Sequence, residues 1–224
     1  MEVLRVGYEA VPVVVIDDFA RDPDGLRAAA VAARFGPAAH HYPGIRADLP
    51  AGYMVDQLPV IAEAIRHIAA DAGPVEVIDA SFSIVTTPPG DLSVQQRLPH
   101  CDAFDGRRIA LVHYLAPGNA DGTAFFRHRS TGFETVDRTR STIWLDQLDA
   151  ELRHGGLPAP GYVTGDTPLF ERIATVEARY NRSLIYPSCL LHSGSIGPDT
   201  DLPADPATGR LTVTAFLSAG VSHD

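Results

Sequence analysis

Residues 75–90, "VEVIDASFSIVTTPPG", mark the point where the chain changes from helix-forming to strand-forming sequence. β-Branched and aromatic residues that end in a Thr/Pro/Gly turn are typical of a β-strand. Later segments of the same kind, separated by Gly and Pro, are 108–118, 122–134, 181–194 and 209–219. The second half of the chain is therefore predicted to form antiparallel strands.

The segments before residue 75 predict one strand and two helices. The β-branched run at 11–19 indicates a strand. Residues 22–35 offer an Asp cap, a Pro at the first helical position and several alanines, so they predict a helix. Residues 38–50 are rich in Pro and Gly and predict a loop. Apolar residues at helical spacing predict a second helix over 55–73.

Two segments among the later strands, 139–156 and 167–180, have apolar periods near 3.6 and are predicted to be helical. Helices combined with antiparallel strands favour an α+β fold. At 224 residues the chain suits a single domain. The expected organisation is one domain (1–224) with an N-terminal strand and helices (1–74), a strand core (75–134 and 181–220) and a helical insertion (135–180). The insertion is a candidate lid or homodimer surface.

Composition argues against several classes of function. The formal net charge of −10 disfavours a nucleic-acid partner, because phosphate binding gains from positive charge. The longest apolar run, 11–16, contains a proline and is too short to span a membrane. There are two cysteines and no secretory leader pattern. We expect a reduced, cytoplasmic protein with no membrane partner.

The stretch "RLPHCDAFDG" at 97–106 places two metal-binding side chains two residues apart, His100 and Asp102. On an extended strand such residues share one face, so both can reach one cation, while Cys101 points away. The third ligand should come from a neighbouring strand. The best candidate is His192 in "LLHSG". The other histidines considered lie in a loop, in helices or within strands: His40, His41, His67, His154, His113 and His128.

Two imidazoles and one carboxylate form the facial triad of non-haem iron(II) oxygenases, which leaves positions open on the metal. An enzyme that uses 2-oxoglutarate must also hold its far carboxylate, and a guanidinium does this bidentately. Arg210 begins the last strand. Thr212 lies two residues later on the same face and can share that carboxylate. The order H-x-D, H, R-x-T is more specific than any of its parts.

Five segments together resemble a known superfamily: "PHCDAFD", "RIALVHYL", "GTAFFRH", "LIYPSCLLHSG" and "RLTVTAFL". They are similar to the iron(II)- and 2-oxoglutarate-dependent dioxygenases of the prolyl-4-hydroxylase-like branch. The resemblance covers roughly residues 75–220. Other segments of the sequence resemble those of a smaller bacterial subfamily. It implies a double-stranded β-helix (jelly-roll, cupin-like) core. It also implies that the chain uses Fe(II), 2-oxoglutarate and O2.

The resemblance carries over residue by residue. His100, Asp102 and His192 match the iron ligands, and Arg210 matches the residue that pairs with 2-oxoglutarate. His113 stands where relatives often have a tyrosine that touches the same carboxylate. This histidine either contacts the cosubstrate or is a buried core residue. The interval from His192 to Arg210 is longer than in relatives, so the residues between them are expected to form a loop.

Three functions remain open. The first is an oxygenase that hydroxylates an amino acid, a peptide or a related small metabolite. The second is a non-catalytic metal- or ligand-binding double-stranded β-helix module, because fold does not dictate function. The third is a metal enzyme that needs no keto acid, which would not require Arg210 and Thr212.

Two polar segments could also contribute to a site. The first, residues 127–129, is either a solvated strand end or a mouth for a substrate carboxylate. The second, which contains Tyr42 and Arg46, is a candidate lid.

Overall fold

The structure is a computed structural model that describes residues 1–38, 42–117 and 121–221. His40 and His41 lie outside the described residues. Eight strands form the larger sheet, in the order β1-β2-β9-β6-β11-β5-β4-β3. Their bounds are β1 Glu2–Val6, β2 Val11–Ile16, β9 Arg182–Pro187, β6 Arg108–Tyr114, β11 Leu211–Val221, β5 Ala72–Val85, β4 Gly44–Ala47 and β3 Gly36–Pro37.

A second, three-stranded sheet has the order β10-β7-β8. Its strands are β10 His192–Ser195, β7 Gly122–His128 and β8 Phe170–Glu177. All strand pairs in both sheets are antiparallel. The helices of the described residues are α1 Pro23–Ala32, α2 Tyr53–Ile68, α3 Arg138–Gly155 and the short 3-10 turns η1 Pro89–Asp91 and η2 Gln95–Arg97. The predicted α+β class is confirmed.

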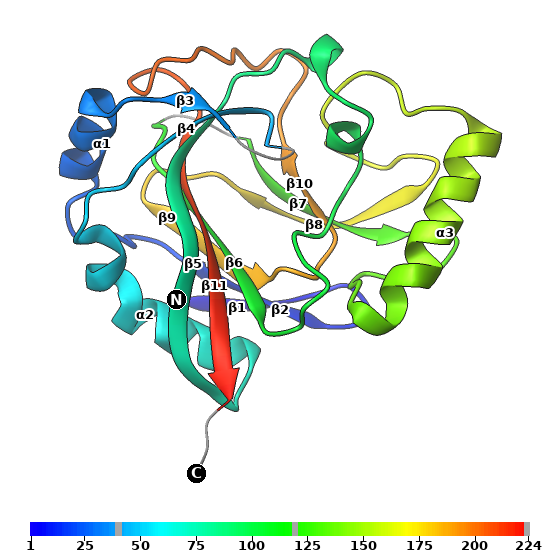
Figure 1. The fold of residues 1–224 in the computed structure, drawn as a ribbon, viewed down its shortest axis with the longest axis horizontal. Helices are drawn as coiled ribbons and strands as arrows, with labels where there is room; N and C mark the ends of the chain where they lie inside the picture. Colours follow the sequence, from blue (N-terminus) through cyan, green and yellow to red (C-terminus); the bar gives the residue numbers. More distant parts are fainter. Residues whose placement is uncertain (39–41, 118–120, 222–224) are drawn as a thin grey trace.

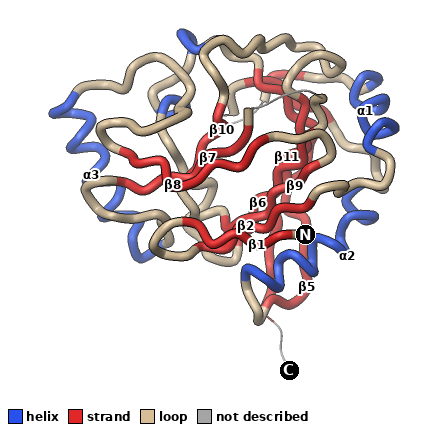
Figure 2. The backbone as a smooth tube through the Cα atoms, turned by 180° about the vertical axis from the view of Figure 1, so that it is seen from behind, coloured by secondary structure: helices blue, strands red, loops and turns tan. Residues whose placement is uncertain are grey.

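The helices cover the outer faces of the two sheets. α1 and α2 lie beside the larger sheet and α3 beside the smaller one, as both views show (Figures 1 and 2). Each outer face has its own apolar cluster. In one, Leu26 of α1 and Ile61 of α2 pack with Val213 of β11. In the other, Trp144 of α3 packs with Phe170 of β8.

A third cluster fills the space between the two sheets. It includes Tyr114 and Tyr186 from the larger sheet and Phe125 from the smaller one. Side chains alternate between the faces of a strand, so residues paired across neighbouring strands point the same way. Tyr114 pairs with Thr212, so Thr212 also belongs to this inner face, whereas Val213 faces the helices. This alternation decides which predicted site residues can meet.

The helix predicted over 167–180 is wrong, because residues 170–177 form strand β8. The pairing of β8 with β7 shifts register between Phe125 and Phe126, which marks a β-bulge. A bulge adds one residue and moves later side chains to the opposite face. Phe170 accordingly packs under α3, whereas Val176 packs between the sheets. The interrupted alternation gave the apolar residues a spacing that imitates a helix.

Two other segments also differ from expectation. The predicted single strand 181–194 is two strands, β9 and β10, which belong to different sheets. Consequently His192 begins a strand rather than ending one. Within the predicted loop 38–50, residues 44–47 form strand β4 and pair with β5. Strand β1 was not predicted. No helix among the described residues is long and apolar enough to cross a membrane.

Candidate functional site

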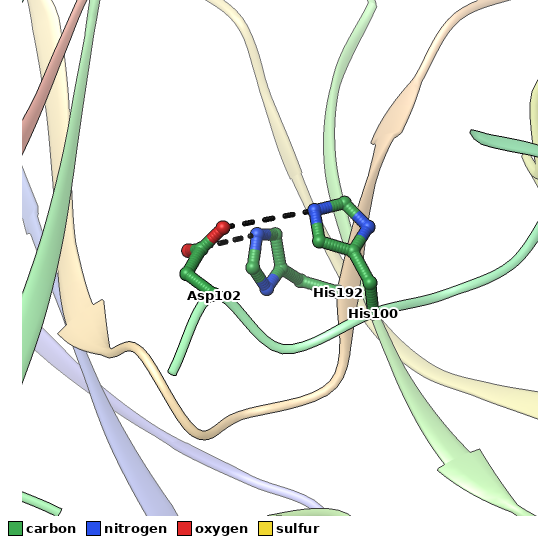
Figure 3. Close-up of side chains that lie close together, drawn as sticks. All are labelled: His100, Asp102 and His192. Carbon is green, nitrogen blue, oxygen red and sulfur yellow. Dashed lines mark ion pairs between the residues drawn. The ribbon is translucent and has the colours of Figure 1, made fainter. Parts of the chain in front are cut away.

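The structure brings His100, Asp102 and His192 together, although they come from two distant parts of the sequence (Figure 3). His192 Nε2 lies 3.4 Å from Asp102 Oδ2, and His100 Nε2 lies 3.7 Å from Asp102 Oδ1. One donor atom from each residue lies within 4.8 Å of the others. We refer to these three residues as the triad.

Backbone hydrogen bonds hold the two halves of the triad in register. The His100 N–H donates to the His192 carbonyl at 2.9 Å, and the His192 N–H donates to the His100 carbonyl at 2.8 Å. The Asp102 N–H donates to the carbonyl of Ser188, also at 2.8 Å. The segment after η2 is thus fixed along the β9–β10 turn. His192 itself gains its position from the pairing of β10 with β7, opposite Phe125.

A second hydrogen bond orients the His192 ring. Its Nδ1 lies 2.9 Å from the carbonyl oxygen of Leu190. A carbonyl can only accept, so Nδ1 carries the proton and the Nε2 lone pair is left free toward Asp102. Such a bond from the distal ring nitrogen is usual for metal-binding histidines. The side chain of His192 is 9% exposed and that of His100 is 51% exposed, so the triad opens to solvent on the His100 side.

The donor set and spacing of the triad suit a divalent transition metal. Ligand atoms at right angles around a metal, with bonds of about 2.1 Å, stand roughly 3 Å apart. The observed 3.4 and 3.7 Å separations need only small side-chain movements to reach that arrangement. Two neutral imidazoles and one carboxylate are the set that non-haem iron(II) sites use, with further positions left open.

Cys101, between two members of the triad, takes no part in it. Its side chain packs against the apolar cluster under α3. Burial raises the pKa of the Cys101 thiol to about 12. The thiolate is the form that binds metals, and at neutral pH it is therefore absent here. Cys189 is buried as well, and neither cysteine forms a disulfide.

Arg210 is buried on the inner face with unused hydrogen-bonding capacity. Its Nη2 donates to the carbonyl of Gly122 at 3.0 Å, and its guanidinium carbon lies 6.0 Å from the Tyr114 ring centre. Its Nε has no hydrogen-bond partner among the described residues. None of the ion pairs formed within the described ranges includes Arg210. A buried cation in this state is suited to receive an anionic ligand.

Hydroxyl groups surround Arg210. Thr212 Oγ1 donates to the carbonyl of Ser83 at 3.2 Å. The Tyr42 hydroxyl has a raised pKa because it is buried, although Arg210, Arg46 and hydrogen bonds to the Thr212 and Ser83 side chains oppose the rise. Tyr42 therefore stays protonated and can donate. The sequence suggested only a lid role for Tyr42, because the β4–β5–β11 pairing that brings it here leaves no local signal.

The assignment of His113 to the cosubstrate is corrected by the structure. His113 pairs with Val213 and faces the helices, away from Arg210. Its Nδ1 accepts from the Tyr53 hydroxyl at 2.8 Å, and its Nε2–H donates to Asn181 Oδ1 at 3.0 Å. Burial lowers the pKa of His113 to about 4. It is the buried core histidine of the two alternatives.

Residues 127–129 are held by ion pairs and hydrogen bonds at the end of β7, where only Arg129 is exposed to solvent. Arg127 pairs with buried Glu134 at 2.5 Å and with Glu171 at 2.9 Å. His128 is fully buried, with its Nε2 2.8 Å from a Glu151 carboxylate oxygen. Arg129 pairs with an exposed aspartate. These contacts tie β7 to its surroundings and leave no free cation for a substrate.

Several solved structures match this chain over nearly its whole length. The carbocyclase SnoK from nogalamycin biosynthesis, described as non-heme and alpha-ketoglutarate dependent, is 12% identical with a TM-score of 0.52, over 92% of this chain and 79% of that chain. AviO1 from Streptomyces viridochromogenes Tue57 is 12% identical with a TM-score of 0.51, over 98% and 93%. A prolyl-4-hydroxylase from Pseudomonas putida is 17% identical with a TM-score of 0.45, over 93% and 92%.

The likeness to SnoK shows that the chain shares the fold of a non-heme, alpha-ketoglutarate-dependent enzyme, as the sequence resemblance predicted. The particular family is given by a sequence model that matches residues 1–217. The chain belongs to that family, which is described as the family of unknown function DUF6445. A search of curated proteins gave no match.

Proposed function

We propose that this protein is a non-haem iron(II)- and 2-oxoglutarate-dependent oxygenase that hydroxylates an amino acid, a peptide or a related small metabolite. The observation that carries the proposal is the triad together with Arg210, whose buried guanidinium has an N–H without a hydrogen-bond partner among the described residues, on the same inner face. The triad and Arg210 are the two halves of the proposed site, and each has its own chemistry. The triad suits the metal, and Arg210 suits an anionic cosubstrate.

The spacing of the two halves fits a dicarboxylate between them. Arg210 bonds to the carbonyl of Gly122, whereas His192 pairs with Phe125 on the same strand. Three residues along a strand correspond to roughly 10 Å. A five-carbon keto acid with one end at the metal and its far carboxylate at Arg210 spans a gap of this size.

His100, Asp102 and His192 would hold the iron. Arg210 would hold the far carboxylate of 2-oxoglutarate, with Thr212 and the protonated Tyr42 hydroxyl as further donors. When bound, iron with 2-oxoglutarate and O2 supplies the oxidation of an unactivated C–H bond. The chain's own contribution is to orient these groups. The Leu190 carbonyl keeps His192 in the ligating tautomer, and the buried floor of Tyr114 and Tyr186 excludes water beneath them.

We also propose that the two facing sheets form a double-stranded β-helix core in one domain, residues 1–224. Strand β8 then belongs to this core, and the helical part of the 135–180 insertion is α3. A reducing, cytoplasmic location is part of the proposal and is supported by two unpaired cysteines.

The proposed function is tested by coupled turnover. Purified protein is loaded with Fe(II) and supplied with 2-oxoglutarate in air, and succinate is measured by mass spectrometry. We expect succinate above the His100→Ala background, since many such sites turn over slowly without substrate. Binding of both ligands without any succinate, even with substrate mixtures, would favour the non-catalytic binding module instead.

A further inference from the structure

A polar pocket lies on the inner face of the larger sheet, on the same side as Arg210. It has a volume of about 340 Å³. Its lining residues are Pro37, Ala38, Arg46, Ala47, Asp48, Asp79 and Ser81. The volume is within the range of small-molecule sites. We refer to it as the Arg46 pocket.

Strand register places the Arg46 pocket on the same face as the proposed cosubstrate site. Arg46 pairs with Ser83, and Ser83 pairs with Thr212. Neighbouring strands are about 4.8 Å apart, so the backbone of Arg46 stands roughly 10 Å from that of β11. Tyr42 bridges this interval, because the Arg46 guanidinium lies 4.7 Å from its ring centre and its hydroxyl reaches Thr212.

Asp79, at the other end of the pocket, belongs to a row of cross-strand pairs that leads toward the triad. Asp79 pairs with Phe216, Phe216 with Ala110, and Ala110 with Tyr186. The Tyr186 ring centre is 5.0 Å from that of His192. This row crosses three strand spacings, roughly 14 Å. The Arg46 pocket and the triad therefore lie on the same face of the sheet, at opposite ends of this row.

The charges in the pocket are adjacent but incompletely satisfied. Arg46 Nη1 lies 3.5 Å from Asp79 Oδ2, beyond the roughly 2.7–3.2 Å of an N–H···O hydrogen bond. Arg46 Nε is buried and has no hydrogen-bond partner within the described residues. The Asp79 side chain is 53% exposed and can accept from a ligand. The Ser81 hydroxyl stands beside them, 3.5 Å from that of Ser83.

We propose that the Arg46 pocket binds the head group of a free α-amino acid, with the carboxylate on Arg46 and the ammonium on Asp79. This inference rests on the proposed function, for which it names the substrate class. An α-amino acid carries opposite charges on adjacent carbons, so it needs a cation and an anion side by side. Arg46 and Asp79 meet that requirement, whereas a peptide interior carries neither charge. The side chain of the bound amino acid would extend along the inner face, in the direction of the triad.

The experiment measures binding directly and does not depend on turnover. Each of the twenty common L-amino acids is titrated calorimetrically into the protein, with and without Fe(II) and 2-oxoglutarate under anaerobic conditions. The best ligand is then compared with its carboxamide and its N-acetyl derivative. We expect at least one amino acid to bind, and each derivative to bind at least tenfold more weakly.

Two variants test the contacts of the carboxylate with Arg46 and of the ammonium with Asp79. Each variant is judged by whether it still prefers the amino acid over a derivative that lacks one of the two charges. In Arg46→Gln the acid and its carboxamide should bind equally, because the carboxylate partner is gone. In Asp79→Asn the preference over the N-acetyl derivative should disappear in the same way. A merely structural role would weaken all ligands together. Matched controls are Arg66→Gln and Glu63→Gln on exposed positions of α2, which should keep both preferences.

Two results would overturn the inference. One is that no amino acid binds in either condition. The other is that Arg46→Gln weakens the acid and the carboxamide by the same factor. Neither result depends on succinate formation. Amino-acid binding without succinate contradicts only the proposed function, and succinate formation without amino-acid binding contradicts only the Arg46 pocket.

Discussion

His100 and His192 exchange two backbone hydrogen bonds, at 2.9 and 2.8 Å, and their rings stand 4.6 Å apart between centres. The contact that brings the triad together is therefore made by the main chain and not by the imidazoles. Removing either ring leaves these two hydrogen bonds in place. Loss of metal binding can thus be separated from loss of fold.

The first prediction concerns metal-dependent stability. A ligand at one hundred times its Kd stabilises a protein by about 2.7 kcal/mol. With anaerobic Fe(II) at that excess, the free energy of unfolding of the wild-type protein, measured with urea, should increase by this amount. His100→Ala and His192→Ala should gain almost nothing, while His154→Ala on the exposed end of α3 should behave as wild type. An equal gain in all four proteins would place the metal elsewhere.

The second prediction concerns the cosubstrate. Hydrogen bonds to charged groups contribute about 1.5–3 kcal/mol, and neutral ones about 1 kcal/mol. Arg210→Gln should therefore weaken 2-oxoglutarate binding by roughly tenfold to more than a hundredfold, and Tyr42→Phe, which removes one hydrogen bond to the same carboxylate, by about tenfold. Calorimetry with the Fe(II)-loaded protein measures both. A Tyr42→Phe protein with unchanged affinity would remove this hydroxyl from the site.

A third prediction follows from the buried imidazole of His113. Its pKa is about 4 in the folded protein against 6.5 when exposed, so the unfolded chain binds the extra proton between these values. Above pH 6.5 His113 is neutral in both states and does not lower the free energy of unfolding. As the pH falls from 6.5 toward 4, the unfolded chain takes up the proton first, and the free energy of unfolding decreases. The loss is about 3 kcal/mol at most. His113→Gln should show a correspondingly flatter dependence in urea unfolding from pH 7 to pH 4.

The fourth prediction concerns the buried carboxylate of Glu134. It accepts the N–H groups of Tyr8 and Glu9, both at 2.9 Å, and pairs with Arg127. Removing one partner of a buried pair costs about 3 kcal/mol or more. Glu134→Gln should destabilise by that amount, and Glu171→Gln, a 41% exposed partner of the same arginine, by less than about 1 kcal/mol. Similar losses in the two variants would contradict this assignment.

The sequence predicted the triad because each of its parts has a local signal. His100 and Asp102 are two residues apart, and His192 precedes a glycine after an apolar run. The order of these residues and Arg210 along the chain matched a known superfamily. The α+β class followed from strand-like and helix-like periods that are visible without any long-range information.

The features of the fold and the site that the sequence did not predict depend on pairing between distant segments. The face on which His113 lies is set by its pairing with Val213, and the position of Tyr42 by the addition of β4 to the sheet edge. The β8 strand escaped prediction because its bulge disturbs the alternation. None of these features leaves a short-range pattern, so the tyrosine beside Arg210 was predicted only as part of a lid.

The proposed function requires that the triad and Arg210 hold metal and 2-oxoglutarate at the same time. Anaerobic titration of the Fe(II)-loaded protein with 2-oxoglutarate tests it most directly, through the visible charge-transfer absorption of the chelated metal. We expect a saturable band in the wild-type protein, none in His192→Ala, and a much weaker affinity in Arg210→Gln. A wild-type protein that binds Fe(II) but develops no band at saturating 2-oxoglutarate would show that the two ligands do not bind together at this site.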